Sequence, residues 1–124
     1  MSIELFLNAI GKLQHVEQTD NGLLVKTHCM YPSLERVIVV VNSRGTGDFV
    51  ISDGGKVSEE FHHLGEEMLT KVLGCACEVF GVGRRSGALF SEANHADDIA
   101  TKVLFVANAS AFAAFTALEY EAAT

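Results

Sequence analysis

The stretch RVIVVVNSRGTGDFVISDGG, residues 36–55, contains two apolar runs joined by a short turn rich in glycine. The β-branched run from Val37 to Val41 does not alternate with polar residues, which predicts a strand buried on both faces at the centre of a sheet. Residues 44–47, RGTG, tolerate positive φ, so we expect a β-hairpin whose return strand covers residues 49–52. The stretch therefore predicts an antiparallel sheet.

The flanking sequence adds strands and helices to this hairpin. Residues 23–30 alternate well enough for a strand, which extends the hairpin to a central meander of three strands. Residues 81–90 predict a small hairpin at the sheet edge. Apolar side chains recur at helical spacing in four segments, residues 2–14, 57–64, 66–80 and 96–118. We therefore expect an α+β fold, in which an antiparallel sheet packs with about four helices.

Length and composition indicate one folded unit. The chain has 124 residues, is 48% hydrophobic and contains one proline, which predicts a single compact domain over residues 1–124. An odd number of cysteines, Cys29, Cys75 and Cys77, does not form a disulfide framework, and no basic segment opens the chain. We expect a cytoplasmic protein, in the host cell if it is encoded by a phage.

The net charge of −7 argues against one class of partner. Acidic residues outnumber basic ones in both halves of the chain, so neither half offers the basic footprint that contact with a nucleic-acid backbone requires. We therefore expect no direct binding of DNA or RNA.

The run from Val103 to Leu118 contains no charged residue. It is shorter than the roughly 20 residues that span a bilayer, and Asn108 and Ser110 interrupt it, so we expect no membrane segment. A helix that is apolar nearly all round is buried on more than one side. Either it crosses the whole domain, or its second face forms a homodimer, which we favour. Small residues would permit the close approach of two copies: Ala107, Ala109, Ala111, Ala113 and Ala114.

The turn formed by Ser52, Asp53, Gly54 and Gly55 lies between a predicted strand and a predicted helix. Backbone N–H groups at such a junction can bind a phosphate or carboxylate. The spacing nevertheless matches neither the P-loop nor the dinucleotide-binding pattern. We favour the structural interpretation, in which Asp53 closes the turn by bonding its own backbone and the two glycines supply unusual φ.

Candidate groups for metal binding or catalysis are poorly spaced. His63 and Glu67 would share a helix face only if one helix ran unbroken through Gly65. Cys75 and Cys77 do not form the C-x-x-C pattern of redox or zinc sites. No histidine or acid stands in a sequence arrangement that would activate a serine or cysteine. We therefore expect no metal site, no cofactor and no enzymatic activity, although an enzyme stays open as the alternative.

One resemblance follows from the order of these elements. A helix precedes a strand containing Thr27 in the run VKT, then Tyr31-Pro32, a hydrophobic strand, a return strand and the SDGG turn. Over residues 13–64 this order resembles a family of small bacterial and phage-borne domains of unknown function. The resemblance implies a role in modulating a host machine or defence system.

We predict a non-enzymatic protein-binding modulator from a phage or mobile element, an inhibitor of a host defence system such as CRISPR. Its partner would be another protein, against which clustered glutamates could mimic phosphate charge. The predicted binding residues are Ser52, Asp53, Gly54, Gly55, Glu59, Glu60, His63, Glu66 and Glu67. The alternative is a small-ligand-binding or hydrolytic enzyme with its site at the Ser52 to Gly55 turn, assisted by His62 or His63.

Overall fold

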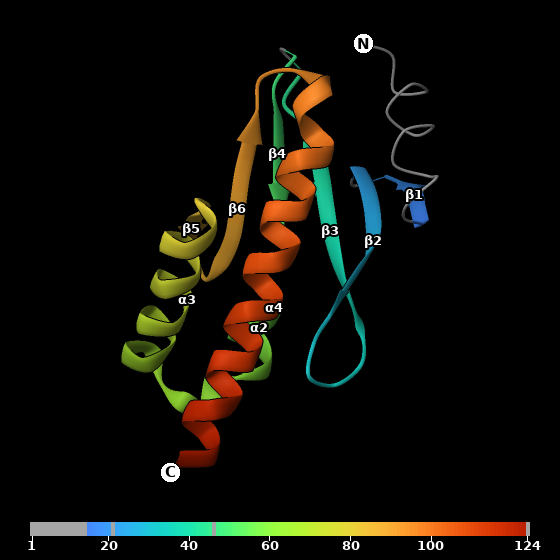
Figure 1. Cartoon of the computed structure of the whole chain (residues 1–124). Coiled ribbons are helices and arrows are strands. Elements are labelled where there is room, and N and C mark those ends of the chain that lie inside the picture. The colour runs from blue at the N-terminus through green and yellow to red at the C-terminus, as the bar shows by residue number, and fades with distance from the viewer. Residues whose placement is uncertain (1–14, 21, 46, 124) are drawn as a thin grey trace.

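The computed structural model describes residues 15–20, 22–45 and 47–123, so the helix expected over residues 2–14 lies outside the described residues. Figure 1 shows a sheet with one long helix lying across it and a shorter helix beside that one. The strands are β1 (His15–Thr19), β2 (Gly22–Met30), β3 (Arg36–Ser43), β4 (Phe49–Ser52), β5 (Gly83–Arg85) and β6 (Ala88–Ala93). The α-helices are α2 (Lys56–Glu60), α3 (Glu66–Phe80) and α4 (Ile99–Ala123), with short 3₁₀ turns at η1 (His62–Leu64) and η2 (Ala96–Asp98).

The α+β prediction is confirmed. All neighbouring strands are antiparallel, in the order β1-β2-β3-β4-β6-β5. The predicted meander has a further strand, β1, which pairs with β2 from His15↔Lys26 to Thr19↔Gly22. Sequence reasoning missed β1 because HVEQT has a single apolar residue, Val16, and so shows no alternation.

The edge hairpin of β5 and β6 has the predicted tight turn. Its two turn residues, Ser86 and Gly87, have φ of 51° and 81°, the pair of positive values that a type I′ turn requires. β6 lies between β4 and β5, so this late hairpin extends the sheet begun by the meander.

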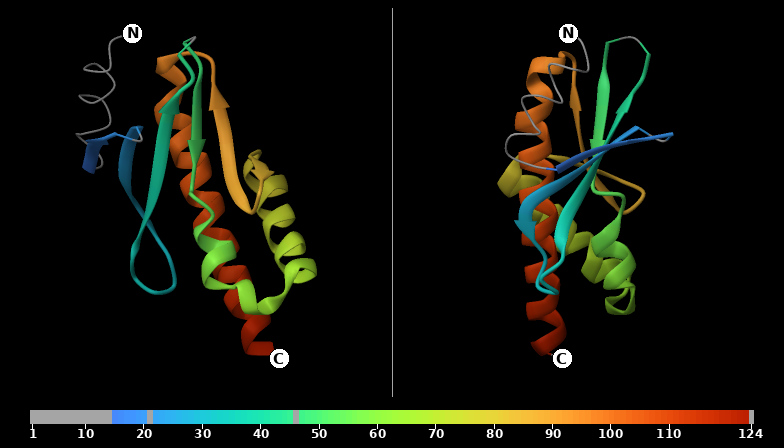
Figure 2. Two further views of the ribbon diagram at one scale, coloured as in Figure 1. Left: turned by 180° about the vertical axis from the view of Figure 1, so that it is seen from behind. Right: turned by 90° about the vertical axis from the view of Figure 1, so that its right-hand side faces the viewer.

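The burial of β3 differs from the prediction. Val37, Val39 and Val41 are buried, whereas Ile38 is 44% exposed and Val40 is half-buried. The strand is central in the sheet but covered on one face, because α4 crosses one side and no described helix crosses the other. Figure 2 shows this uncovered face in the view from behind. A run of valines therefore did not distinguish a doubly buried strand from one with an uncovered face.

The irregular part of β2 is organised by a buried threonine. The register between β2 and β3 shifts between Lys26 and Met30. At that shift the Thr27 hydroxyl donates to the Val37 carbonyl at 2.8 Å and accepts from the Cys29 amide at 3.2 Å. The hydroxyl thereby satisfies two backbone groups that a regular ladder would have paired.

Helix α4 supplies the core on its sheet-facing side. Its buried residues include Val103, Val106, Ala107, Ala113 and Ala114, and it contacts β2, β3, β4, β6 and α3. The small residues expected to allow a second copy to approach instead let α4 lie close to the sheet. Ala111 alone of the five named alanines is half-buried. The homodimer stays a prediction, but its contacts would have to come from Ala111 and from exposed side chains of α4.

The length argument against a membrane segment does not hold for the helix as observed. Residues 96–123 form a helical segment long and apolar enough to cross a membrane by length and composition. In its most apolar window, 44% of the residues are buried within the fold. A core helix of a soluble protein passes the same test, so the segment is weak evidence for a membrane location.

The two helices expected after Gly55 are separated as predicted. Gly65 has φ of 91°, lies between η1 and α3, and accepts the Leu69 amide at its carbonyl. Helix α3 covers residues 66–80, the predicted range.

Candidate functional site

The Ser52 to Gly55 turn has the local bond that we favoured from sequence. The Asp53 carboxylate accepts a hydrogen bond from the Gly55 amide at 2.9 Å, and the Ser52 hydroxyl accepts one from the Gly54 amide at 3.0 Å. Gly54 and Gly55 have φ of 73° and 78°. These values place both glycines in the left-handed region, where a side chain would be strained.

The same carboxylate also bonds two elements that are remote in sequence. Its Oδ1 accepts the Leu89 amide of β6 at 3.0 Å, and its Oδ2 accepts the Ser110 hydroxyl of α4 at 2.7 Å. The Asp53 amide in turn donates to the Leu89 carbonyl at 3.1 Å. Asp53 is 5% exposed. It therefore joins the end of β4 to β6 and to α4 from inside the core.

Tyr31 completes this arrangement. Its hydroxyl lies 2.7 Å from the Ser110 hydroxyl. Because Ser110 gives its proton to the carboxylate, Tyr31 is the donor to Ser110. We call Asp53, Ser110 and Tyr31, with the amides of Gly55 and Leu89, the Asp53 network. Every member is buried or half-buried, and the four hydrogen bonds that define the network join each member to at least one other.

Burial shifts the protonation of both acidic groups in the network. Desolvation raises the pKa of Asp53, and the hydrogen bonds from Gly55, Ser110 and Leu89 oppose that rise. Desolvation likewise raises the pKa of Tyr31 to about 12. Both shifts have the sign of groups held inside a protein, and raised pKa values also occur in catalytic acids. Access therefore decides between a structural and a chemical role.

Access to Asp53 is narrow. Asp53 and Tyr31 line a hollow of about 190 Å³ together with Arg36 and Lys56 among others. The carboxylate oxygens are already engaged by two amides and a hydroxyl. A substrate would have to displace one of those bonds inside the core, at the cost of an unsatisfied buried group.

The histidines proposed to assist this turn are engaged elsewhere. His62 Nδ1 lies 3.1 Å from the Glu59 carbonyl, and His63 Nε2 contacts the carboxylate of Glu121 near the end of α4. Because η1 and Gly65 interrupt the helix, the His63 and Glu67 pair lacks the continuous helix it needed. Among the described residues, no group of three or more His, Cys, Asp or Glu could hold a metal ion.

The predicted acidic cluster is divided between two helices. Glu60 pairs with Lys56 at 3.4 Å within α2. Glu59, Glu66 and Glu67 are exposed. Figure 1 shows α2 and the C-terminal end of α4 at the same end of the molecule. The exposed carboxylates of Glu59, Glu66 and Glu67 stay available to solvent and to a partner.

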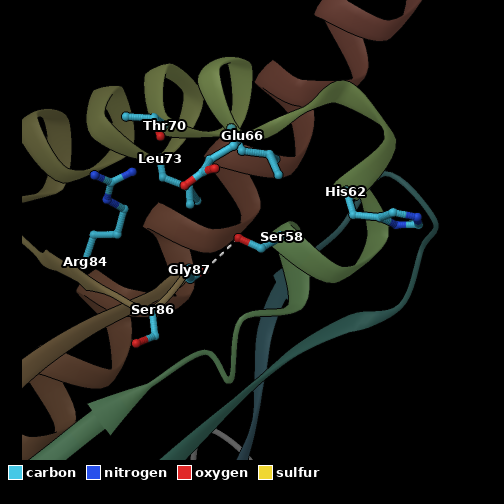
Figure 3. Close-up of a pocket in the computed structure, with 9 residues that line it drawn as sticks. Ser58, His62, Glu66, Thr70, Leu73, Arg84, Ser86 and Gly87 are labelled. Carbon is cyan, nitrogen blue, oxygen red and sulfur yellow. Dashed lines mark hydrogen bonds between the residues drawn. The ribbon is translucent and has the colours of Figure 1, made fainter.

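A larger hollow lies between α2, α3 and the β5–β6 turn, with a volume of about 490 Å³. Figure 3 shows Arg84 of β5 and Glu66 of α3 on its two sides, whereas the His62 ring points away from both. The Ser58 hydroxyl donates to the Gly87 carbonyl at 2.7 Å, which fixes α2 to the β5–β6 turn. Of the nine predicted binding residues, Glu66 alone lines this hollow, and His62, expected to assist the Ser52 to Gly55 turn, lines it as well. Ser58 is engaged with backbone rather than with a general base.

Sequence reasoning found Asp53 but missed Tyr31 and Ser110 as its partners. Ser110 is 57 residues away in sequence, so no local spacing could reveal the contact. A signal was present, because a serine within a long apolar helix needs a hydrogen-bond partner if it is buried. That signal indicates that Ser110 has a hydrogen-bond partner, but it does not identify the partner.

The chain matches no known protein-family model, and it matches no curated protein and no solved structure. The resemblance over residues 13–64 therefore stays a prediction.

Replacing Ser110 with alanine should lower the free energy of unfolding by about 1–3 kcal/mol, because it leaves a buried carboxylate oxygen and the Tyr31 hydroxyl without their partner. Chemical denaturation monitored by circular dichroism measures this change. Thr116→Ala is the matched control, since the Thr116 hydroxyl donates to the Phe112 carbonyl within the same helix. The control should stay within about 0.5 kcal/mol of the parent. Equal effects of the two substitutions would contradict a special role for Ser110.

The raised pKa of Asp53 predicts a pH dependence of stability. At pH values above 3.8, the ordinary pKa of an aspartate, the folded state retains a proton that the unfolded state loses. The free energy of unfolding should therefore fall as the pH rises from that value through the raised pKa. Asp53→Asn should lack this component, so denaturation at a series of pH values should give a flatter profile. Parallel profiles for the two proteins would show that Asp53 does not titrate in this way.

Proposed function

We propose that the protein is a non-enzymatic protein-binding modulator of phage or mobile-element origin. In this role it inhibits a host defence system such as CRISPR, and it acts in the host-cell cytoplasm. The resemblance of residues 13–64 to small phage-borne domains supports the origin and the role. The chemistry of the described residues supports the absence of catalysis.

One observation carries this proposal. The sharpest candidate group for chemistry, the Asp53 carboxylate, is 5% exposed and accepts hydrogen bonds from two amides and a buried hydroxyl. A general base must reach the proton that it removes, and a nucleophile must reach the substrate. Asp53 instead satisfies the amides of Leu89 in β6 and of Gly55 just before α2, so its contribution is to hold the fold.

The acidic residues around α2 provide one surface for a partner. Glu59, Glu66 and Glu67 are exposed and lie on a chain with net charge −7. Exposed carboxylates can occupy the place of phosphates on a basic protein surface, and such charge complementarity accelerates association. This acidic surface favours a partner whose basic surface ordinarily binds nucleic acid.

Expression of the protein in a bacterium with an active CRISPR system should raise the plating efficiency of a phage which that system targets. An isogenic strain without the system is the control and should show no change. Neutralising the acidic surface with Glu59→Gln, Glu60→Gln, Glu66→Gln and Glu67→Gln should reduce the effect.

A matched variant neutralises four exposed acids elsewhere, Glu17→Gln, Glu78→Gln, Asp97→Asn and Asp98→Asn, and should keep the effect. Plating that is unchanged by the parent protein would contradict the inhibitor role. An equal loss of the plating effect in both variants would show that the acidic surface has no specific role in inhibition.

We also propose a homodimer through the outer side of α4, within the run from Val103 to Leu118. Leu104, Phe115 and Leu118 are between 39% and 50% exposed. With Asn108 and Ala111 they follow an alternating spacing of four and three residues, which is the seam of a coiled coil. Two copies of one helix satisfy such a seam against each other, and a polar residue such as Asn108 within it sets the register.

Light scattering over a range of concentrations should show a dimer for the parent protein and a monomer for Phe115→Glu. The control is Tyr120→Glu, which changes an exposed aromatic residue of α4 that lies outside the seam. The control should stay dimeric. A parent protein that is monomeric at every concentration would rule out the dimer.

A further inference from the structure

The turn between β2 and β3 holds an exposed leucine in a strained conformation. Leu34 has φ of 72° and is 78% exposed. Its amide donates to the Tyr31 carbonyl at 2.9 Å, and the Tyr31 amide donates to the Glu35 carbonyl at 2.9 Å, so the turn is closed on both sides. Glycine or asparagine adopts this left-handed conformation readily, whereas a bulky side chain rarely does. The leucine therefore costs stability and recovers little by burial.

Leu34 borders a hollowed part of the uncovered sheet face. One hollow of about 340 Å³ is lined by Lys26, Met30, Leu34, Glu35, Arg36 and Ile38. It adjoins the 190 Å³ hollow, since Glu35, Arg36 and Ile38 line both. The face lies opposite α4, and no described helix covers it in Figure 2. We call the six residues of the larger hollow the Leu34 surface.

The Leu34 surface combines apolar side chains with two basic side chains, Lys26 and Arg36. Met30 is 38% exposed and Ile38 is 44% exposed. No salt bridge to a described residue neutralises Lys26 or Arg36. Glu35 is the one acidic residue among the six. In a chain of net charge −7, a surface with two bases and one acid beside exposed apolar groups reverses the general charge balance.

We infer that the Leu34 surface is a docking site for a protein segment that carries an apolar side chain flanked by carboxylates. The inference rests on the proposed function and adds a second surface, of opposite charge to the acidic one around α2. The apolar side chain of the partner contacts Leu34, Met30 and Ile38. Its carboxylates pair with Lys26 and Arg36. Strain at Leu34 is retained because an exposed apolar anchor is useful for binding, as strained residues often are at functional sites.

A nucleic acid fits this surface less well. Backbone binding requires several bases on one track, and the surface offers two bases beside three apolar side chains and a carboxylate. The net charge of the whole chain also opposes the approach of a polyanion.

The test uses two synthetic peptides, Asp-Glu-Leu-Phe-Asp-Glu and Lys-Lys-Leu-Phe-Lys-Lys, each titrated into the ¹⁵N-labelled full chain. The acidic peptide should shift the amide signals of Met30, Leu34 and Ile38, and the basic peptide should not. Lys26→Glu combined with Arg36→Glu should weaken the acidic peptide by about tenfold or more, as expected for loss of its charge partners. Lys71→Glu, which changes an exposed base on α3, should leave binding unchanged. Equal shifts by both peptides, or equal weakening by both variants, would overturn the proposal.

Leu34→Gly separates binding from folding. Relief of the left-handed strain should raise the denaturation midpoint, and loss of the apolar anchor should weaken the acidic peptide by about tenfold. A variant that is more stable and binds equally well would overturn the role of Leu34. A lowered midpoint would overturn the claim of strain.

A photoreactive benzoylphenylalanine at position 34 identifies the occupant. Cross-linking to the acidic peptide supports the proposal. Cross-linking to a second copy of the chain, to its own residues 1–14, or to a single-stranded oligonucleotide in preference to the peptide would overturn it. If the acidic peptide does not bind but the protein still raises phage plating, the docking site fails and the proposed function stands. If the peptide binds as described but plating is unchanged, the proposed inhibitor role fails and the docking site stands.

Discussion

A carboxylate buried in a protein core must have its oxygens satisfied, and in this fold that requirement is met by residues from three separate parts of the chain. Asp53 directly follows β4, and its oxygens accept hydrogen bonds from Gly55 at the start of α2, from Leu89 in β6 and from Ser110 in the middle of α4. Removing any partner leaves a polar group without water or protein to bond it, which is expensive in the interior. The carboxylate therefore ties the position of α4 along its axis to the junction of the sheet with α2.

The Asp53 network also connects the two proposed binding surfaces, the Leu34 surface and the acidic surface around α2. Through Ser110 it reaches Tyr31, which opens the turn that carries Leu34. Through the Gly55 amide it fixes the start of α2, where the acidic residues follow. The turn that carries Leu34 and the start of α2 are thus both hydrogen-bonded to the same buried network. Buried hydrogen bonds of the network hold these elements in place. The exposed side chains of the two surfaces are therefore not needed for that purpose.

The sequence predicted the fold class well because its signals are local. Period-two alternation in residues 23–30, positive-φ residues between the two strands of the central hairpin, and helical spacing over residues 66–80 all concern neighbours in the chain. The run from Val37 to Val41 misled, since valine suits an exposed strand position as well as a buried one. Covering of the second face depends on where α4 and α3 lie, which is decided by packing between distant segments.

The site was predictable only in part for the same reason. The turn-closing bond from Asp53 to Gly55 spans two residues and was expected, whereas the bonds to Leu89 and Ser110 span 36 and 57 residues. Thr27, Tyr31 and Asp53, on which the predicted resemblance to phage-borne domains rests, are buried in the structure. A pattern made of buried polar residues describes a framework. The surface residues that would contact a partner, such as Leu34, lie outside that pattern and were not singled out.

The central claim is that the Asp53 carboxylate holds the fold from the inside. Native-state hydrogen exchange measured by NMR tests it most directly, through the amides of Gly55 and Leu89 that donate to this carboxylate. The account predicts that both amides exchange only when the whole domain unfolds, so that their protection equals the global free energy of unfolding. Exchange of these two amides through local openings, much faster than global unfolding allows, would contradict it.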